Sequence, residues 1–105
     1  MDDASTALLC TDGGEKPNVS FNERMLAYYR YENKNQRVNS LESSADILVY
    51  DLLRGKEPIA LTKMPKGYYA QFPHYRSDGW LYFTVLNAWT DVRFVVATDV
   101  SLHVE

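Results

Sequence analysis

The stretch YRSDGWLYF, residues 75–83, places an Asp-Gly pair in front of a run of large β-forming side chains. Glycine tolerates a positive φ, and Asp-Gly beside strand-forming residues is a strong signal for a hairpin turn. In the strand that follows, Trp80 and Tyr82 share one face, while Leu81 and Phe83 share the other. The stretch therefore predicts a turn that opens a packed strand.

Short runs of strand-forming residues recur along the chain, and no segment shows a sustained helical period. They lie at residues 6–10, 25–31, 47–53, 59–62, 80–86 and 92–98. Both faces of the run 25–31 are largely apolar, which predicts a central strand. The polar residues 32–44 predict a long exposed loop, and Pro65, Gly67 and Pro73 mark residues 65–73 as a connector. These patterns predict an all-β fold with mostly antiparallel pairing.

Length and charge narrow the class of protein further. A chain of 105 residues has room for one core, so we expect a single all-β domain over residues 1–105. The net charge of -3 disfavours duplex nucleic acid and anionic membranes as partners. Asp2 and Asp3 stand where a signal peptide is positive, and no apolar run reaches the ~20 residues of a membrane span. We expect a soluble protein without membrane insertion, cytoplasmic as given or periplasmic if the chain is a fragment of a secreted protein.

Two parts of the chain repeat one pattern of proline, short strand, polar turn, strong strand, loop, and a strand ending in Asp. PNVSFNERMLAYY (17–29) aligns with PHYRSDGWLYFTV (73–85), and ILVYDL (47–52) aligns with VVATDV (95–100). The repeats extend over about residues 17–62 and 73–104. Paired positions include Pro17 with Pro73, Met25 with Leu81, and Asp51 with Asp99.

This pattern resembles the TolB-like β-propeller repeat, whose blades read Pro-x-x-Ser-Pro-Asp-Gly before an apolar strand, and later a strand ending near Asp, a Gly turn and Leu-Thr. PHYRSDGWLYF carries the turn without its second proline, and DILVYDLLRGKEPIALT (46–62) matches the later half of a blade. The first copy has Asn22 and Glu23 where Asp-Gly stands in the family. The resemblance implies antiparallel sheets of two blade-like repeats; a small β-sandwich or a plain meander is the alternative.

A complete propeller contains typically 4 to 8 blades, whereas this chain holds about two. The resemblance therefore implies a fragment of a larger propeller, assembly with other copies, or a compact variant of the repeat. TolB-like propellers act as periplasmic scaffolds or as accessory domains that gate hydrolases. By resemblance, this favours a scaffold or interaction role.

The polar residues favour neither catalysis nor metal binding. His74, Ser77 and Asp78 lie in one strand-turn segment, where their side chains diverge instead of forming a relay. His74 and His103 have no Cys or His neighbour at ligand spacing, and the single Cys10 excludes an internal disulfide. We expect no enzymatic activity, no cofactor and no metal site.

Aromatic side chains in or beside loops are the candidates for partner binding, because Tyr and Trp anchor a partner at low entropy cost. An alternative for Tyr68 and Phe72 is packing beneath the connector as part of the core. The sequence predicts a non-catalytic interaction or assembly module that binds a protein partner or its own copies. The candidate contacts are Tyr68, Tyr69, Phe72, Tyr75 and Trp89.

Two other functions stay open. One is the non-catalytic propeller portion of a peptidase or polysaccharide lyase whose catalytic residues lie elsewhere. The other is single-stranded nucleic-acid binding by the segment RMLAYYRYENKNQR (24–37), which combines Arg24 and Arg30 with tyrosines for base stacking. Tyr28 and Tyr29 point to opposite faces of a strand, so at most half of this set forms one platform.

Overall fold

The computed structural model describes residues 15–20, 24–32, 40–55 and 57–99. These residues form seven β-strands and no helix, which confirms the all-β prediction. The run 6–10 lies outside the described residues. The strands are β1 (Glu15–Val19), β2 (Met25–Tyr31), β3 (Ala45–Asp51), β4 (Ile59–Ala60), β5 (Tyr68–Tyr75), β6 (Leu81–Asn87) and β7 (Val92–Thr98).

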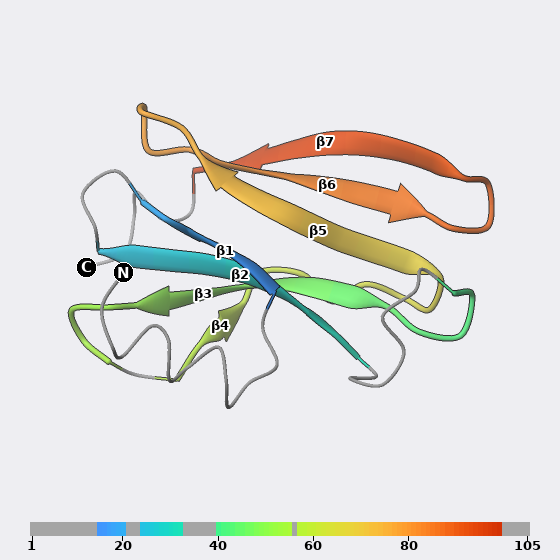
Figure 1. Cartoon of the computed structure of the whole chain (residues 1–105), viewed down its shortest axis with the longest axis horizontal. Helices are drawn as coiled ribbons and strands as arrows, with labels where there is room; N and C mark the ends of the chain where they lie inside the picture. Colours follow the sequence, from blue (N-terminus) through green and yellow to red (C-terminus); the bar gives the residue numbers. More distant parts are fainter. Residues whose placement is uncertain (1–14, 21–23, 33–39, 56, 100–105) are drawn as a thin grey trace.

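The strands join in one open mixed sheet with the order β1-β2-β3-β5-β6-β7, and β4 pairs with β3 (Figure 1). β-Propeller blades are not seen as separate units in this sheet. Neighbouring strands are antiparallel except β3 and β5, which meet in parallel at Ala45 and Tyr69. Beyond this pair β5 diverges from β3 and contacts β1 and β2, where the Tyr75 N–H donates to Asn18 Oδ1 (2.8 Å). The sheet therefore folds over itself and encloses a core.

Alternate side chains of β2 pack on opposite faces of the sheet, and both sets are apolar, which explains why β2 is an interior strand. Met25, Ala27 and Tyr29 turn toward the main core, while Leu26 and Tyr28 belong to a smaller apolar cluster on the opposite face. All five are buried, and β2 lies between β1 and β3, as its two apolar faces predict. Leu26 is fully buried, so its truncation to alanine removes about 2–5 kcal/mol of stability.

The connector predicted at residues 65–73 was wrong over most of its length, because β5 begins at Tyr68. Its proline is accommodated by a bulge: the pairing with β6 shifts between Gln71 and His74. Phe72 takes a positive φ of 56° within the bulge, and a bulge tolerates the missing N–H of Pro73. Proline here marks an irregularity inside a strand and does not end it.

The predicted Asp-Gly turn is confirmed. Gly79 has a φ of 88°, the Arg76 N–H donates to the Trp80 carbonyl (2.9 Å), and Asp78 Oδ1 accepts from the Trp80 N–H (3.0 Å). The side-chain and backbone bonds together fix the sharp return from β5 into β6.

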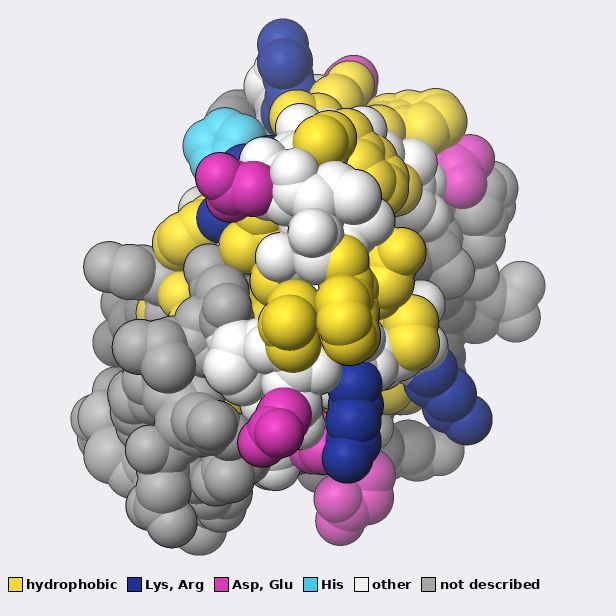
Figure 2. All heavy atoms as spheres, turned by 90° about the vertical axis from the view of Figure 1, so that its right-hand side faces the viewer, with side chains coloured by type: hydrophobic (Ala, Val, Ile, Leu, Met, Phe, Trp, Pro, Cys, Tyr) yellow, Lys and Arg dark blue, Asp and Glu magenta, His cyan; other side chains and the backbone are white. Residues whose placement is uncertain are grey.

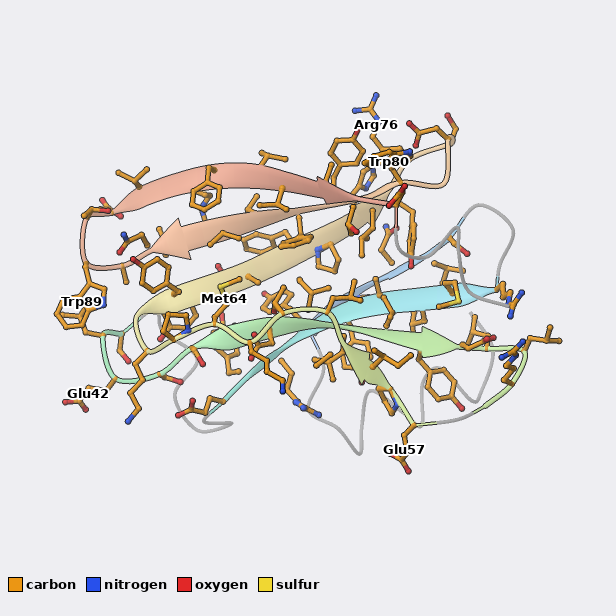
Figure 3. All side chains as sticks on the ribbon, turned by 180° about the vertical axis from the view of Figure 1, so that it is seen from behind. Glu42, Glu57, Met64, Arg76, Trp80 and Trp89 are labelled. Carbon is orange, nitrogen blue, oxygen red and sulfur yellow. The ribbon has the colours of Figure 1, made fainter. Side chains whose placement is uncertain are left out.

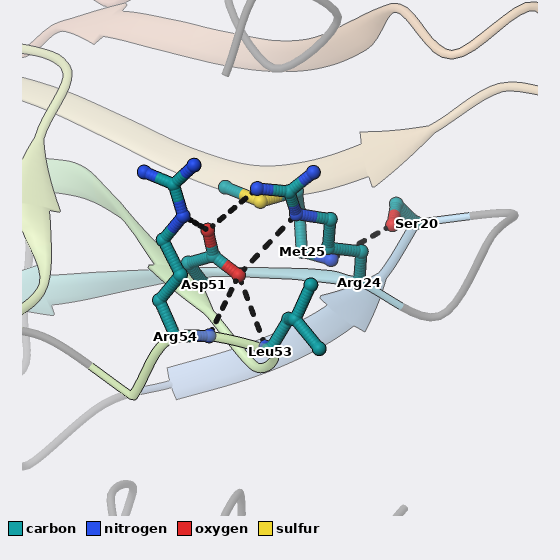
Figure 4. A network of polar contacts seen from close by, with 6 residues as sticks. All are labelled: Ser20, Arg24, Met25, Asp51, Leu53 and Arg54. Carbon is teal, nitrogen blue, oxygen red and sulfur yellow. Dashed lines mark hydrogen bonds and ion pairs between the residues drawn. The ribbon is translucent and has the colours of Figure 1, made fainter. Parts of the chain in front are cut away.

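A second aspartate organises the turn after β3 (Figure 4). Asp51 accepts from Arg24 Nη2 (3.1 Å) and from the N–H groups of Leu53 (3.0 Å) and Arg54 (3.2 Å). The bond from Arg24 is the largest cause that lowers the pKa of Asp51, and the two backbone bonds act in the same direction. An aspartate at a strand end thus satisfies turn N–H groups.

Candidate functional site

β7 forms one outer edge of the sheet. Its pairing with β6 is regular from Val92 to Thr98, without a bulge. β1 at the other edge differs, because Pro17 and a register shift between Glu15 and Asn18 interrupt its pairing. Such irregularities, prolines and charges are how natural proteins protect a sheet edge from other strands. β7 contains no proline and, of charged residues, only Arg93, so its edge is suited to accept a strand.

Large apolar side chains are exposed along this edge. The exposed fractions are 55% for Val92, 50% for Phe94 and 66% for Val95. Figure 2 faces the end of the molecule where Trp89 joins β6 to β7 and shows hydrophobic side chains from the centre of this face to its top. An apolar, regular edge of this kind is a candidate interaction surface.

The backbone groups of β7 alternate between its two edges. The hydrogen bond from Arg76 N–H to the Trp80 carbonyl fixes the even-numbered β6 residues as those that bond to β5, so the odd-numbered ones bond to β7. Phe94 and Val96 lie opposite odd-numbered β6 residues and turn their backbone groups inward. The N–H and C=O groups of Arg93, Val95 and Ala97 point to the outer edge of β7, where no strand lies among the described residues.

An apolar groove of about 480 Å³ runs beside β7. One wall is the segment that follows β4, and Met64 of this segment lies over the middle of the sheet (Figure 3). The other wall is formed by β6 and β7, whose side chains alternate into the groove. The main contributors are Leu61 and Met64, Phe83 and Val85, and Phe94 and Val96.

Hydrogen bonds hold the first wall in place. Asp46 Oδ1 accepts from Thr62 Oγ1 (2.6 Å) and from the Met64 N–H (2.8 Å). Thr62 Oγ1 accepts in turn from the Ile47 N–H (3.1 Å). The segment is thereby fixed to β3, and the groove exists before any partner arrives.

The opposite face of β7 carries Arg93, whose position is also fixed. Its Nη1 donates to Thr84 Oγ1 (2.9 Å) and Gln71 Oε1 (3.3 Å), and its guanidinium lies 5.5 Å from the Phe72 ring centroid. Phe72 in turn meets Tyr29 edge to face at 5.4 Å. Burial, and next the neighbouring Tyr31, raise the pKa of Tyr29 to about 12. The single cation of β7 is therefore pre-ordered on the face away from the groove.

The five predicted contact residues divide by burial. Tyr69 and Tyr75 lie in the core, and the Tyr69 hydroxyl donates to the Ser40 carbonyl (2.7 Å). Tyr68 is half-buried and accepts from Asn87 Nδ2 (3.1 Å). Phe72 and Trp89 are exposed by 45% and 62%. The rings of Tyr69 and Tyr75 are enclosed, so the structure does not bring the five side chains together on one surface.

Trp89 lies in the β6–β7 loop and closes the far end of the molecule (Figure 3). Its Nε1 donates to the Lys66 carbonyl (3.2 Å), and its ring lies directly over Gly67. The neighbouring Ala88 N–H donates to the Gly67 carbonyl (2.8 Å). These contacts tie the loop to the start of β5 and orient the hairpin that presents β7.

The candidate contacts predicted from the sequence did not include the exposed residues of β7, although the composition of this strand carries a signal. VRFVVA (92–97) holds a single charge, no proline and five apolar residues, a composition that native edges avoid. The composition alone does not say that the strand lies at an edge.

The structure also bears on base stacking, metal binding and membrane spanning. Tyr28 and Tyr29 are buried, so neither ring is accessible for base stacking. Within the described ranges no three His, Cys, Asp or Glu side chains group to hold a metal ion. The same residues contain no helix long and apolar enough to cross a membrane.

Comparison of the chain with protein-family models, curated proteins and solved structures found no match.

Proposed function

We propose that the protein is a non-catalytic interaction or assembly module that binds a protein partner, or its own copies, through the β7 edge and the adjoining groove. The observation that carries this proposal is the regular apolar edge of β7 beside the groove of about 480 Å³. A strand added to such an edge gains main-chain hydrogen bonds, and its alternate side chains enter the groove. Both parts are needed for binding that is strong and selective.

The same chain holds a precedent for strand addition. β4 pairs with β3 at Leu48 and Val49, on the side away from β2, and the Leu61 N–H donates to the Ile47 carbonyl (2.8 Å). β4 contains two residues, so a very short strand suffices for this edge. β7 offers a longer edge of the same kind.

The proposal includes the finer fold assignment, in which β1–β4 and β5–β7 are related units of the β-propeller type. Each half starts with a proline-containing strand and continues as an antiparallel meander. The ladders pair Tyr50 with Leu26 and Thr98 with Leu81. If Asp51 corresponds to Asp99, the preceding residues Tyr50 and Thr98 also correspond, and so do their pairing partners Leu26 and Leu81. This correspondence differs by one residue from the sequence alignment, which places Met25 with Leu81. Met25, Leu26 and Leu81 are all buried, so both alignments match apolar core residues.

Under this correspondence β7 takes the place of β3. The counterparts of Leu48 and Val49, which pair with β4, are Val96 and Ala97 of β7. On the side of β7 away from β6, the described residues place no strand. A fourth strand from a partner would complete the second half as β4 completes the first.

The test offers the sequence of β4 in trans. A capped peptide of residues 57–62 (EPIALT) is titrated into the isotope-labelled protein, and amide chemical shifts are followed. We expect saturable changes centred on Val95, Val96 and Ala97. A control peptide with lysine in place of Ile59 and Leu61 should produce none. Unperturbed β7 amides with both peptides, together with a solution mass independent of concentration, would contradict the proposed function.

A further inference from the structure

The edge of β7 sets a chemical requirement on its occupant. On one face of the occupant, side chains enter the groove beside Phe94 and Val96; on the other they lie against Val95 and Ala97. The occupant must therefore be apolar on both faces over several residues. β4 has only two residues, Ile59 and Ala60, whereas β7 has seven and carries apolar side chains on both faces.

Two copies of β7 can pair only in certain registers. A two-fold axis perpendicular to the sheet makes the strands antiparallel and places one residue opposite its own copy. Side chains directly opposite then share a face, so groove residues meet groove residues. The outward groups of Arg93, Val95 and Ala97 supply the hydrogen bonds in each such register, and the axis passes through Phe94, Val95 or Val96.

Charge selects among these registers. An axis at Val95 places Asp91 opposite Asp99 of the second copy, where like charges destabilise the pair. An axis at Phe94 leaves Arg93 opposite Val95. An axis at Val96 places Arg93 opposite Asp99 twice, once on each side of the axis.

Resting on the proposed function, we infer that the partner is a second copy of this chain, paired antiparallel through β7 about a two-fold axis at Val96. Val95 lies opposite Ala97 of the second copy, and Phe94 opposite Thr98. Arg93 keeps its place beside Gln71 and Thr84, on the face that carries Asp99 of the second copy. The dimer joins the two sheets into one and covers both grooves with apolar side chains.

The first test locates the axis by disulfide formation in a Cys10→Ser background, where an introduced thiol is the only one. Val96 and its copy form a non-hydrogen-bonded pair, with Cα atoms about 4.5 Å apart, within disulfide reach. We expect Val96→Cys to form a covalent dimer under mild oxidation. Val92→Cys is the matched control. In this register residue 92 of the second copy lies eight positions along the strand from the point opposite Val92, a distance of about 27 Å. Equal cross-linking at both positions, or cross-linking at Val95→Cys in place of Val96→Cys, would overturn the inferred register.

The second test reverses the charges and measures solution mass by light scattering over a concentration series. The wild type should approach twice the 12.1 kDa of the chain. Arg93→Asp and Asp99→Arg should each weaken the dimer by about tenfold or more, because each places like charges opposite one another. The double variant should restore dimerisation, an outcome that damage to the fold would not produce.

The outcomes separate this inference from the function on which it rests. A wild-type protein that stays monomeric while the peptide of residues 57–62 still shifts the β7 amides overturns the second copy as partner and leaves the interaction site intact. A dimer unaffected by either charge reversal overturns the β7 pairing. A dimer that the double variant restores supports it.

Discussion

Replacement of Gly67 by alanine tests how the β6–β7 hairpin is held. Gly67 has a φ of 89°, a conformation that costs an L-residue about 1–2 kcal/mol. Its backbone is held from both sides, because the N–H donates to the Ser43 carbonyl (2.7 Å) and the carbonyl accepts from Ala88 (2.8 Å). A Cβ at this position would overlap the Trp89 indole, with Cδ1 at 2.7 Å, and overpacking of this kind costs about 1–3 kcal/mol. We expect Gly67→Ala to lower the free energy of unfolding by about 2–5 kcal/mol.

A double-mutant cycle separates the two costs. Trp89→Ala alone should cost under about 1 kcal/mol, because the side chain is 62% exposed and loses one hydrogen bond to the Lys66 carbonyl. In that background Gly67→Ala should cost only the backbone part, about 1–2 kcal/mol. Urea unfolding followed by circular dichroism measures all four proteins. An equal cost of Gly67→Ala in both backgrounds would refute the steric contact, and a cost under about 0.5 kcal/mol would also refute the backbone strain.

Three further predictions concern Asp51, Phe72 and Tyr29. Because the folded-state pKa of Asp51 is lowered, the stability that its carboxylate contributes is present above the unfolded pKa of about 3.9 and is lost as pH falls through the folded value. The difference in urea midpoint between wild type and Asp51→Asn should therefore shrink from neutral pH to acid. An unchanged difference would contradict this. Phe72→Gly should be more stable than Phe72→Ala by about 1–2 kcal/mol in urea unfolding, because both lose the ring and glycine alone relieves the positive φ; equal stabilities would count against strain at the bulge. An ultraviolet titration should show a tyrosine that ionises at about 12 in the wild type and not in Tyr29→Phe; the associated stability is complete below a pH of about 10 and is lost as pH rises toward 12.

The strands and turns that depend on neighbouring residues could be predicted from the sequence. β2 and β7 follow from local alternation, and the turn at Asp78-Gly79 follows from the φ that glycine permits. β5 could not, because Pro73 signals a connector unless the bulge at Gln71–His74 is known. The bulge depends on pairing with β6 and has no local signature.

The candidate site was less predictable than the strands, since it depends on contacts between distant residues. Tyr69 is a residue type that often anchors a partner at a surface, but its parallel pairing with Ala45 brings it into the core. Val95 looks like a buried strand residue, yet the strand order leaves it 66% exposed. Sheet order decides both cases, and a single sequence does not specify it.

Amide hydrogen exchange at β7 tests the central claim most directly. The N–H groups of Val95 and Ala97 point to the outer edge, whereas those of Phe94 and Val96 bond to β6. In dilute protein, exchange should therefore be fast at Val95 and Ala97 and slow at Phe94 and Val96. Raising the protein concentration should slow exchange at Arg93, Val95 and Ala97, whose N–H groups face the second copy, and leave Phe94 and Val96 unchanged. Protection at Val95 and Ala97 that stays the same at every concentration would contradict strand addition at the β7 edge by a second copy.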